Sequence, residues 1–207
     1  MKSLKKGFII FLISILTISL LIFITYKISF APKVKVIPID SKVELNSKSL
    51  IKKFIPKDIN LSLDGIKFNS NVSLSEEEIT GIILNSVDKN VLTDNNVTGI
   101  NTLINGNELF LYINFEYRGI PLQAVLNFNA YAKNGNAILH YNYGKVGFIN
   151  ISKSYLSNLI ESNSILKVDS NNNNIILSLS KEYGIFIDET YFKDSSLNIK
   201  FHLGINF

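Results

Sequence analysis

The feature that most constrains this chain is a strongly apolar run without a charge near its N-terminus, from Phe8 to Tyr26. As a helix, its 19 residues would be about 28 Å long, which is close to the hydrocarbon thickness of a bilayer. The serines and threonines within the run are tolerable, because their hydroxyls can donate to carbonyls of the same helix. The run therefore predicts a transmembrane helix.

The same run could instead belong to a cleaved signal peptide, although such peptides usually have an apolar region of only about 7–15 residues. Small residues at Ser29 and Ala31 would suit cleavage after Ala31, which remains the alternative. Pro32 would directly follow the cut and hinder a peptidase. We therefore expect residues 1–31 to be a short tail and an uncleaved anchor.

Charge is distributed unevenly along the chain. Lysines at positions 2, 5 and 6 precede the apolar run and favour a cytoplasmic N-terminus, with the C-terminal part outside the cytoplasm. Residues 32–57 carry a net charge of +5 and form the expected juxtamembrane stalk, either beside anionic headgroups or as a solvated linker. The apolar run and this basic stalk make the membrane the expected partner. Residues 58–207 carry a net charge of −5, so we expect no nucleic-acid partner.

The residue types limit the chemistry and suggest a source. The chain has no cysteine, which excludes disulfides and thiol chemistry and is compatible with an exported domain that relies on its core. Arg118 is the only arginine beside many lysines, and asparagine is abundant. This bias is typical of a low-GC bacterial genome.

A helix is predicted to begin after Ser75. Ser75 and Glu78 have the spacing of a capping box, and Leu74 and Ile79 have the positions of a hydrophobic staple. The apolar residues beyond the cap follow helical spacing on one face. This one-sided helix must lie on an apolar surface.

The rest of residues 58–207 reads mainly as strands with one apolar and one polar face. The sequence predicts a three-stranded antiparallel meander, with turns at RGIP and NGN, and a second helix in SKSYLSNLIES. Further strands are expected before and after these elements: around 59–68, 171–180, 183–189 and 195–207. The expected fold class is α+β: an antiparallel meander sheet covered on one face by two helices, following the transmembrane helix.

No catalytic, cofactor or metal site is predicted. His140 and His202 fall on strands without other ligands at suitable spacing, and a metal site needs three or four converging groups. The acidic residues at 76–78 have a structural role in the first helical turn. Arg118 could bind a carboxylate or phosphate, but a solvated hairpin tip is the simpler interpretation. We expect a protein that is not an enzyme.

The segments VSLSEEEITGIIL and NELFLYINFEYRGIPLQAVLNFNAYAKNGNAILHYNYGKVGFINISKSYL resemble the YpmS-like family. These are membrane-anchored proteins of low-GC Gram-positive bacteria. The helix signature departs from the family pattern at Ser75 and Thr80. The same order of elements also resembles one half of the tubular lipid-binding folds, in which a curled sheet and its helix enclose acyl chains.

This second resemblance implies a cleft that binds a lipid-like ligand. Its apolar lining residues would be Ile79, Ile83, Leu111, Ile113, Leu126 and Phe128. A fully packed core would use the same residues at the same spacing, and the domain would then be an interaction or scaffold module of the cell envelope. In that case the contact patch would contain Phe110, Tyr112 and Tyr131.

Overall fold

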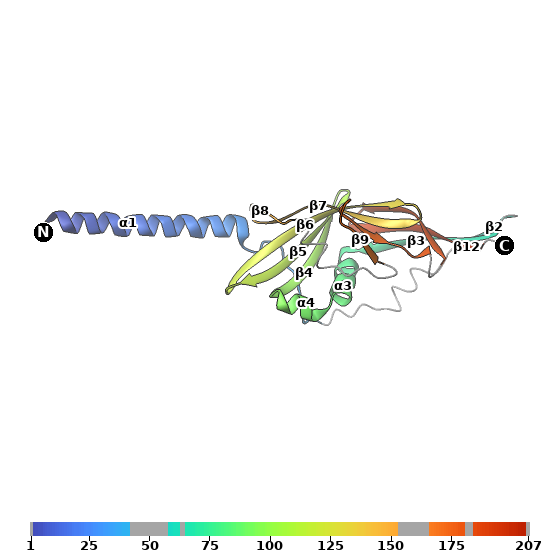
Figure 1. Ribbon diagram of the computed structural model, residues 1–207, viewed down its shortest axis with the longest axis horizontal. Coiled ribbons are helices and arrows are strands. Elements are labelled where there is room, and N and C mark those ends of the chain that lie inside the picture. Colours follow the sequence, from blue (N-terminus) through green and yellow to red (C-terminus); the bar gives the residue numbers. More distant parts are fainter. Residues whose placement is uncertain (1, 42–57, 63–64, 153–165, 181–183, 206–207) are drawn as a thin grey trace.

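The computed structural model describes residues 2–41, 58–62, 65–152, 166–180 and 184–205. A long N-terminal helix projects from one end of an elongated body, which is built from antiparallel sheets with shorter helices against them (Figure 1). The predicted α+β class is therefore confirmed, and so is an apolar helix ahead of the sheets.

The N-terminal helix α1 (Lys2–Thr25) continues as a π-helical turn, η1 (Tyr26–Phe30). Its side chains are exposed from Lys6 to the end of α1. The hydroxyls of Ser14 and Thr17 each donate to the carbonyl four residues earlier, at 2.9 Å. The helix thus satisfies these polar groups internally, as the sequence predicts.

The larger sheet has the strand order β1–β4–β5–β6–β7–β10–β9, and β8 also pairs with β7. All of these pairings are antiparallel. The strands are β1 (Ile37–Pro38), β4 (Val97–Asn105), β5 (Glu108–Tyr117), β6 (Ile120–Lys133), β7 (Asn136–Val146), β8 (Ile149–Asn150), β9 (Leu166–Asp169) and β10 (Asn174–Leu177). The predicted meander, β5 to β7, forms the centre of this sheet.

The two hairpins of the meander turn as predicted. Arg118 and Gly119 connect β5 to β6 with φ angles of 52° and 76°. Asn134 and Gly135 connect β6 to β7 with φ angles of 55° and 73°. Two successive residues with positive φ are the mark of a type I′ turn, whose twist suits a two-residue hairpin.

One part of the predicted alternation is wrong. Strict alternation through AILHYNY would place Tyr141 and Tyr143 on the same face of β7, but Tyr141 is 5% exposed and Tyr143 is 41% exposed. A bulge explains the difference: Asn127 pairs with Tyr143 and Phe128 with Tyr141, so Asn142 is an extra residue in β7. An extra residue resets the alternation of the strand beyond it.

A second sheet, which the sequence did not predict, has the order β11–β12–β3–β2. Its strands are β2 (Asp58–Ser62), β3 (Gly65–Ser75), β11 (Ile185–Lys193) and β12 (Ser196–Ile205). The strands themselves agree with the predicted extended segments. Alternation identifies a strand but not its partner, and β12 pairs with the distant β3 along ten residues.

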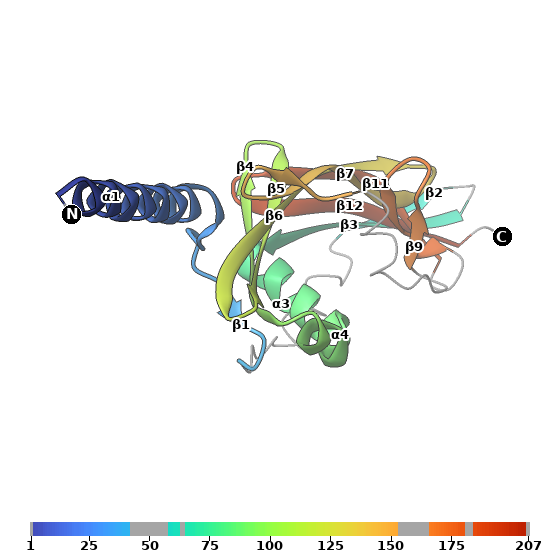
Figure 2. The same ribbon diagram turned by 60° about the vertical axis from the view of Figure 1, so that its left-hand side comes forward.

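The main core cluster contains residues of both sheets and of the helix α3 (Glu76–Ser86), which follows β3 directly. The predicted capping box of α3 is confirmed, because the Ser75 hydroxyl accepts from Glu78 N at 3.3 Å and Glu78 Oε2 accepts from Ser75 N at 2.9 Å. A shorter helix, α4 (Lys89–Asp94), was not predicted. Figure 2 shows α3 and α4 together on one side of the sheets. The second predicted helix lies almost entirely outside the described residues.

Candidate functional site

The six predicted lining residues come from three elements that the fold brings together. Helix α3 provides Ile79 and Ile83, β5 provides Leu111 and Ile113, and β6 provides Leu126 and Phe128. Ile79, Leu126 and Phe128 are buried members of the main core cluster, and the other three pack against it while remaining partly exposed. Their role in binding a ligand stays a prediction.

The three partly exposed residues have a distinctive position. Ile83, Leu111 and Ile113 pack against the main cluster and also against a second buried cluster, formed by Leu84, Leu92 and Ile100. They therefore form an apolar strip between the two clusters, with no charged side chain among them. We call Ile83, Leu111 and Ile113 the junction strip.

A buried polar contact fixes α3 on the edge of the larger sheet. The hydroxyls of Thr80 and Thr102 lie 2.8 Å apart, and both side chains are fully buried. Thr102 N donates to Thr80 Oγ1 at 2.9 Å, and Ile104 N donates to Glu76 Oε1 at 2.5 Å. Two backbone donors at the edge of β4 thus find side-chain acceptors on α3, which closes an edge that could otherwise pair with another chain.

This role of Glu76 could not be read from the sequence. Its place in the first turn of α3 suggests only a favourable interaction with the helix dipole. Finding this role would have required recognising β4 as a strand. The strand was not predicted, because Thr102 interrupts its apolar face. With β4 recognised, Thr80 and Glu76 on α3 would have been candidate partners for its edge.

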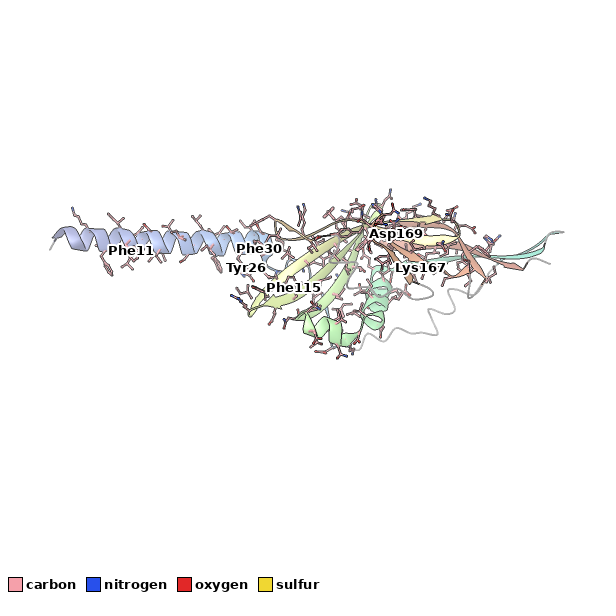
Figure 3. The ribbon with its side chains drawn as sticks, viewed as in Figure 1. Phe11, Tyr26, Phe30, Phe115, Lys167 and Asp169 are labelled. Carbon is pink, nitrogen blue, oxygen red and sulfur yellow. The ribbon has the colours of Figure 1, made fainter. Side chains whose placement is uncertain are left out.

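The end of the apolar helix is fastened to the meander. Tyr26 donates from its hydroxyl to the Pro121 carbonyl at 2.8 Å. The Gln123 side chain accepts from the amides of Lys33 and Val34 at 3.2 Å each and donates to the Val34 carbonyl at 2.8 Å. Figure 3 shows Tyr26 and Phe30 where the helix meets the strands.

A second contact joins the helix to the turn between β7 and β8. The rings of Phe30 and Phe148 lie edge to face, with centroids 4.9 Å apart. A Cβ added to Gly147 would come within 2.8 Å of the Phe30 ring, and its φ of +60° also favours glycine. After these contacts, β1 pairs with β4, so part of the expected stalk joins the sheet.

The predicted aromatic contact patch is only partly exposed. Tyr131 is exposed on β6, whereas Phe110 and Tyr112 on β5 are half-buried. Burial raises the pKa of Tyr112, and the nearby Tyr143 raises that pKa further. These residues therefore present a smaller surface than expected.

The candidate polar groups remain dispersed. His140 Nδ1 lies 2.8 Å from Asn174 Oδ1, and His202 Nδ1 lies 2.9 Å from the Asp188 carboxylate. Within the described parts of the chain, no group of three or more His, Cys, Asp or Glu side chains could hold a metal ion. Arg118 is at the exposed β5–β6 turn, with its guanidinium carbon 5.4 Å from the centroid of the Tyr117 ring.

Among the residues described, one helix is long and apolar enough to cross a membrane, from Lys6 to Phe30. None of its most apolar window is buried in the protein. No protein-family model matches the chain, and no curated protein or solved structure was found to match it.

Proposed function

We propose that the protein is a single-pass membrane protein with a cytoplasmic N-terminus and a C-terminal domain outside the cytoplasm. The apolar span from Lys6 to Phe30 is exposed along α1, and such a surface requires an apolar environment that the domain does not provide. The lysines ahead of the span support this orientation, since positive charge is retained in the cytoplasm.

We also propose that the domain is not catalytic and binds a lipid-like ligand at the helix–sheet junction. The observation that carries this proposal is the junction strip: Ile83, Leu111 and Ile113 touch both core clusters but keep part of their surface accessible. Burial of such a surface by an acyl chain would be favourable by about 25 cal/mol per Å². The buried residues Ile79, Leu126 and Phe128 would form the floor behind the strip.

Kinship with the YpmS-like proteins of low-GC Gram-positive bacteria is part of this proposal. It is supported by the helix ahead of the domain, by the capping box that begins α3, and by the long meander that leads into the GKVGFI segment. These agreements concern architecture and short motifs.

The alternative function is an envelope scaffold or protein-interaction module without a ligand. The deep burial of Leu126 and Phe128 favours this alternative, because side chains packed in the protein's own core leave almost no surface for a ligand to contact. The exposed Tyr131 would then belong to the contact surface, together with the accessible parts of Phe110 and Tyr112.

Photo-crosslinking separates these two functions. The full chain would be placed in vesicles that contain a phospholipid with a diazirine at the end of one acyl chain, and crosslinked residues would be assigned by mass spectrometry. The lipid-binding proposal predicts crosslinks at the junction strip in addition to those on α1. Because α1 meets lipid in either case, its crosslinks show that the labelling worked.

Matched variants make the test specific. Ile83→Asn should reduce crosslinking at Leu111 and Ile113, whereas Val91→Asn on the exposed face of α4 should leave it unchanged. If crosslinks occur on α1 but never at the junction strip, the domain carries no lipid, and the scaffold function is favoured instead.

A further inference from the structure

The domain has one end that lies beside the end of the apolar helix. In Figure 1 the β5–β6 hairpin reaches back to the level of the end of α1, and the β7–β8 turn lies next to the helix. The Tyr26–Pro121 hydrogen bond and the contact between Phe30 and Phe148 hold these two turns in place. They belong to the part of the domain that any membrane around α1 would meet first.

This end is unusually apolar for a protein surface. Tyr117, Ile120, Phe148 and Ile149 are 58%, 49%, 68% and 56% exposed. Among the described residues beyond Phe30, these are the four most exposed large apolar side chains. All four lie in or next to the two turns that contact the end of the helix, so they are gathered at this end of the domain rather than scattered over it.

The charge around this surface suits an anionic partner. Arg118 lies between Tyr117 and Ile120, and Lys145 lies on β7 close to the second turn, with its amino group 5.2 Å from the centroid of the Tyr143 ring. Lys27 is exposed at the end of the helix. Glu116 is the adjacent acidic residue, so basic side chains are in excess here.

The length of the apolar helix indicates how deep in the bilayer these exposed apolar residues would lie. The uncharged run ends at Tyr26, about 28 Å of helix beyond Phe8, so Tyr26 would lie where hydrocarbon gives way to headgroups. Tyrosine is enriched at this depth, because its ring is apolar and its hydroxyl is polar. The Pro121 carbonyl accepts from that hydroxyl, which places neighbouring Ile120 close to the same level.

We propose that Tyr117, Arg118, Ile120, Phe148 and Ile149, the membrane-facing rim, dock into the headgroup layer of the bilayer that α1 spans. The apolar side chains would enter the boundary between headgroups and acyl chains, and Arg118 with Lys145 would contact anionic headgroups. This inference rests on the proposed membrane anchoring. It adds a second attachment, which fixes the orientation of the domain as well as its distance from the bilayer.

The absence of tryptophan from the chain allows a direct test. Full-length Phe148→Trp and Ile120→Trp would each be reconstituted in vesicles of phosphatidylcholine and phosphatidylglycerol, with and without brominated acyl chains. Bromine quenches only tryptophans that lie within the bilayer. We expect the quenched fraction to be several-fold larger for both rim positions than for Tyr131→Trp, an exposed position near the other end of β6.

The charge requirement is tested in the same vesicles. Arg118→Glu combined with Lys145→Glu should lower the quenching of a tryptophan at position 148, and vesicles of phosphatidylcholine alone should lower it too. Lys133→Glu, at the far end of β6, is the matched control and should leave the quenching unchanged.

The outcomes separate failure of the docking from failure of the anchor. If the protein floats with the vesicles but the rim tryptophans are quenched by aqueous iodide as fully as the control and not by bromine, the docking is wrong. Shielding from both quenchers would indicate a second copy or another protein on the rim and would also overturn it. If the protein does not float with the vesicles, the anchoring itself is wrong.

Discussion

The Tyr26 hydroxyl at the end of the apolar helix donates to the Pro121 carbonyl at the start of β6, 95 positions later in the chain. Together with the contacts of Gln123 to residues 33 and 34, this bond makes the helix and the meander one connected structure. A flexible tether would leave the domain free to turn, whereas this junction presents the same end of the domain to the helix terminus.

Substitution of Gln123 tests the junction. Gln123→Ala removes the acceptor for the amides of Lys33 and Val34 and the donor to the Val34 carbonyl. We expect faster hydrogen–deuterium exchange in residues 33–39, measured on the full chain in detergent micelles. Lys133→Ala on the same strand should have no such effect, and equal exchange in both variants would show that Gln123 does not hold the segment.

Substitution of Gly99 tests how closely β1 approaches β4. A Cβ at this position would lie 2.7 Å from the Ile37 carbonyl oxygen and 2.5 Å from Val36 Cγ2. Gly99→Ala should therefore displace β1 from β4 and destabilise the domain by about 1–3 kcal/mol. Gly7→Ala, which meets no atom within 4 Å, is the control. Unchanged protection of the Ile39 amide, which donates to Thr98 O, would contradict this close approach.

The buried threonine pair tests the attachment of α3. Thr80→Val keeps the shape of the side chain but leaves Thr102 N without its acceptor, so unfolding should become easier by about 1–3 kcal/mol. Urea unfolding followed by near-ultraviolet circular dichroism measures the change. Thr93→Val is the control, because the Thr93 hydroxyl is exposed and donates only within α4. Similar losses in the two variants would argue against a special role for the pair.

Ionisation of the buried Tyr141 should lower the stability of the domain at alkaline pH. Burial raises the pKa of Tyr141 above its ordinary value of 10.0, so the folded state favours the neutral phenol more than the unfolded chain does. The resulting contribution to stability is complete below pH 10 and is lost as the pH rises through the folded-state pKa. Tyr141→Phe should flatten the decline of stability measured by urea unfolding above pH 10. A decline of the same slope in this variant would assign it to other groups.

Local patterns in the sequence predicted most elements of the fold, because caps, turns and alternation act between near neighbours. Ser75 with Glu78 defined the start of α3, and Asn134 with Gly135 defined a hairpin. The second sheet was missed because its pairing of β12 with β3 depends on residues far apart in the chain. The bulge at Asn142 was missed because an extra residue in a strand leaves no local sequence signal.

Of the two candidate sites, the residues of the junction strip were named from the sequence, whereas those of the membrane-facing rim were not. The one-sided helix α3 was predicted to lie on an apolar surface, and the resemblance to tubular lipid-binding folds grouped Ile83, Leu111 and Ile113, which the structure brings together. Their role in binding a ligand stays a prediction. The membrane-facing rim was not predicted. Its residues lie in two turns that are distant in sequence, and only the contacts of Tyr26 and Phe30 bring these turns to the end of the helix.

The most direct test of the account uses the absence of cysteine from the chain. Full-length Ser3→Cys and Ser170→Cys would be expressed in a bacterial host, and intact cells or spheroplasts would be treated with a maleimide that cannot cross membranes. We predict labelling of position 170 in intact cells and labelling of position 3 only after the membrane is permeabilised. Labelling of both positions in intact cells, or of neither until permeabilisation, would contradict a domain held outside the cytoplasm by a membrane-spanning α1.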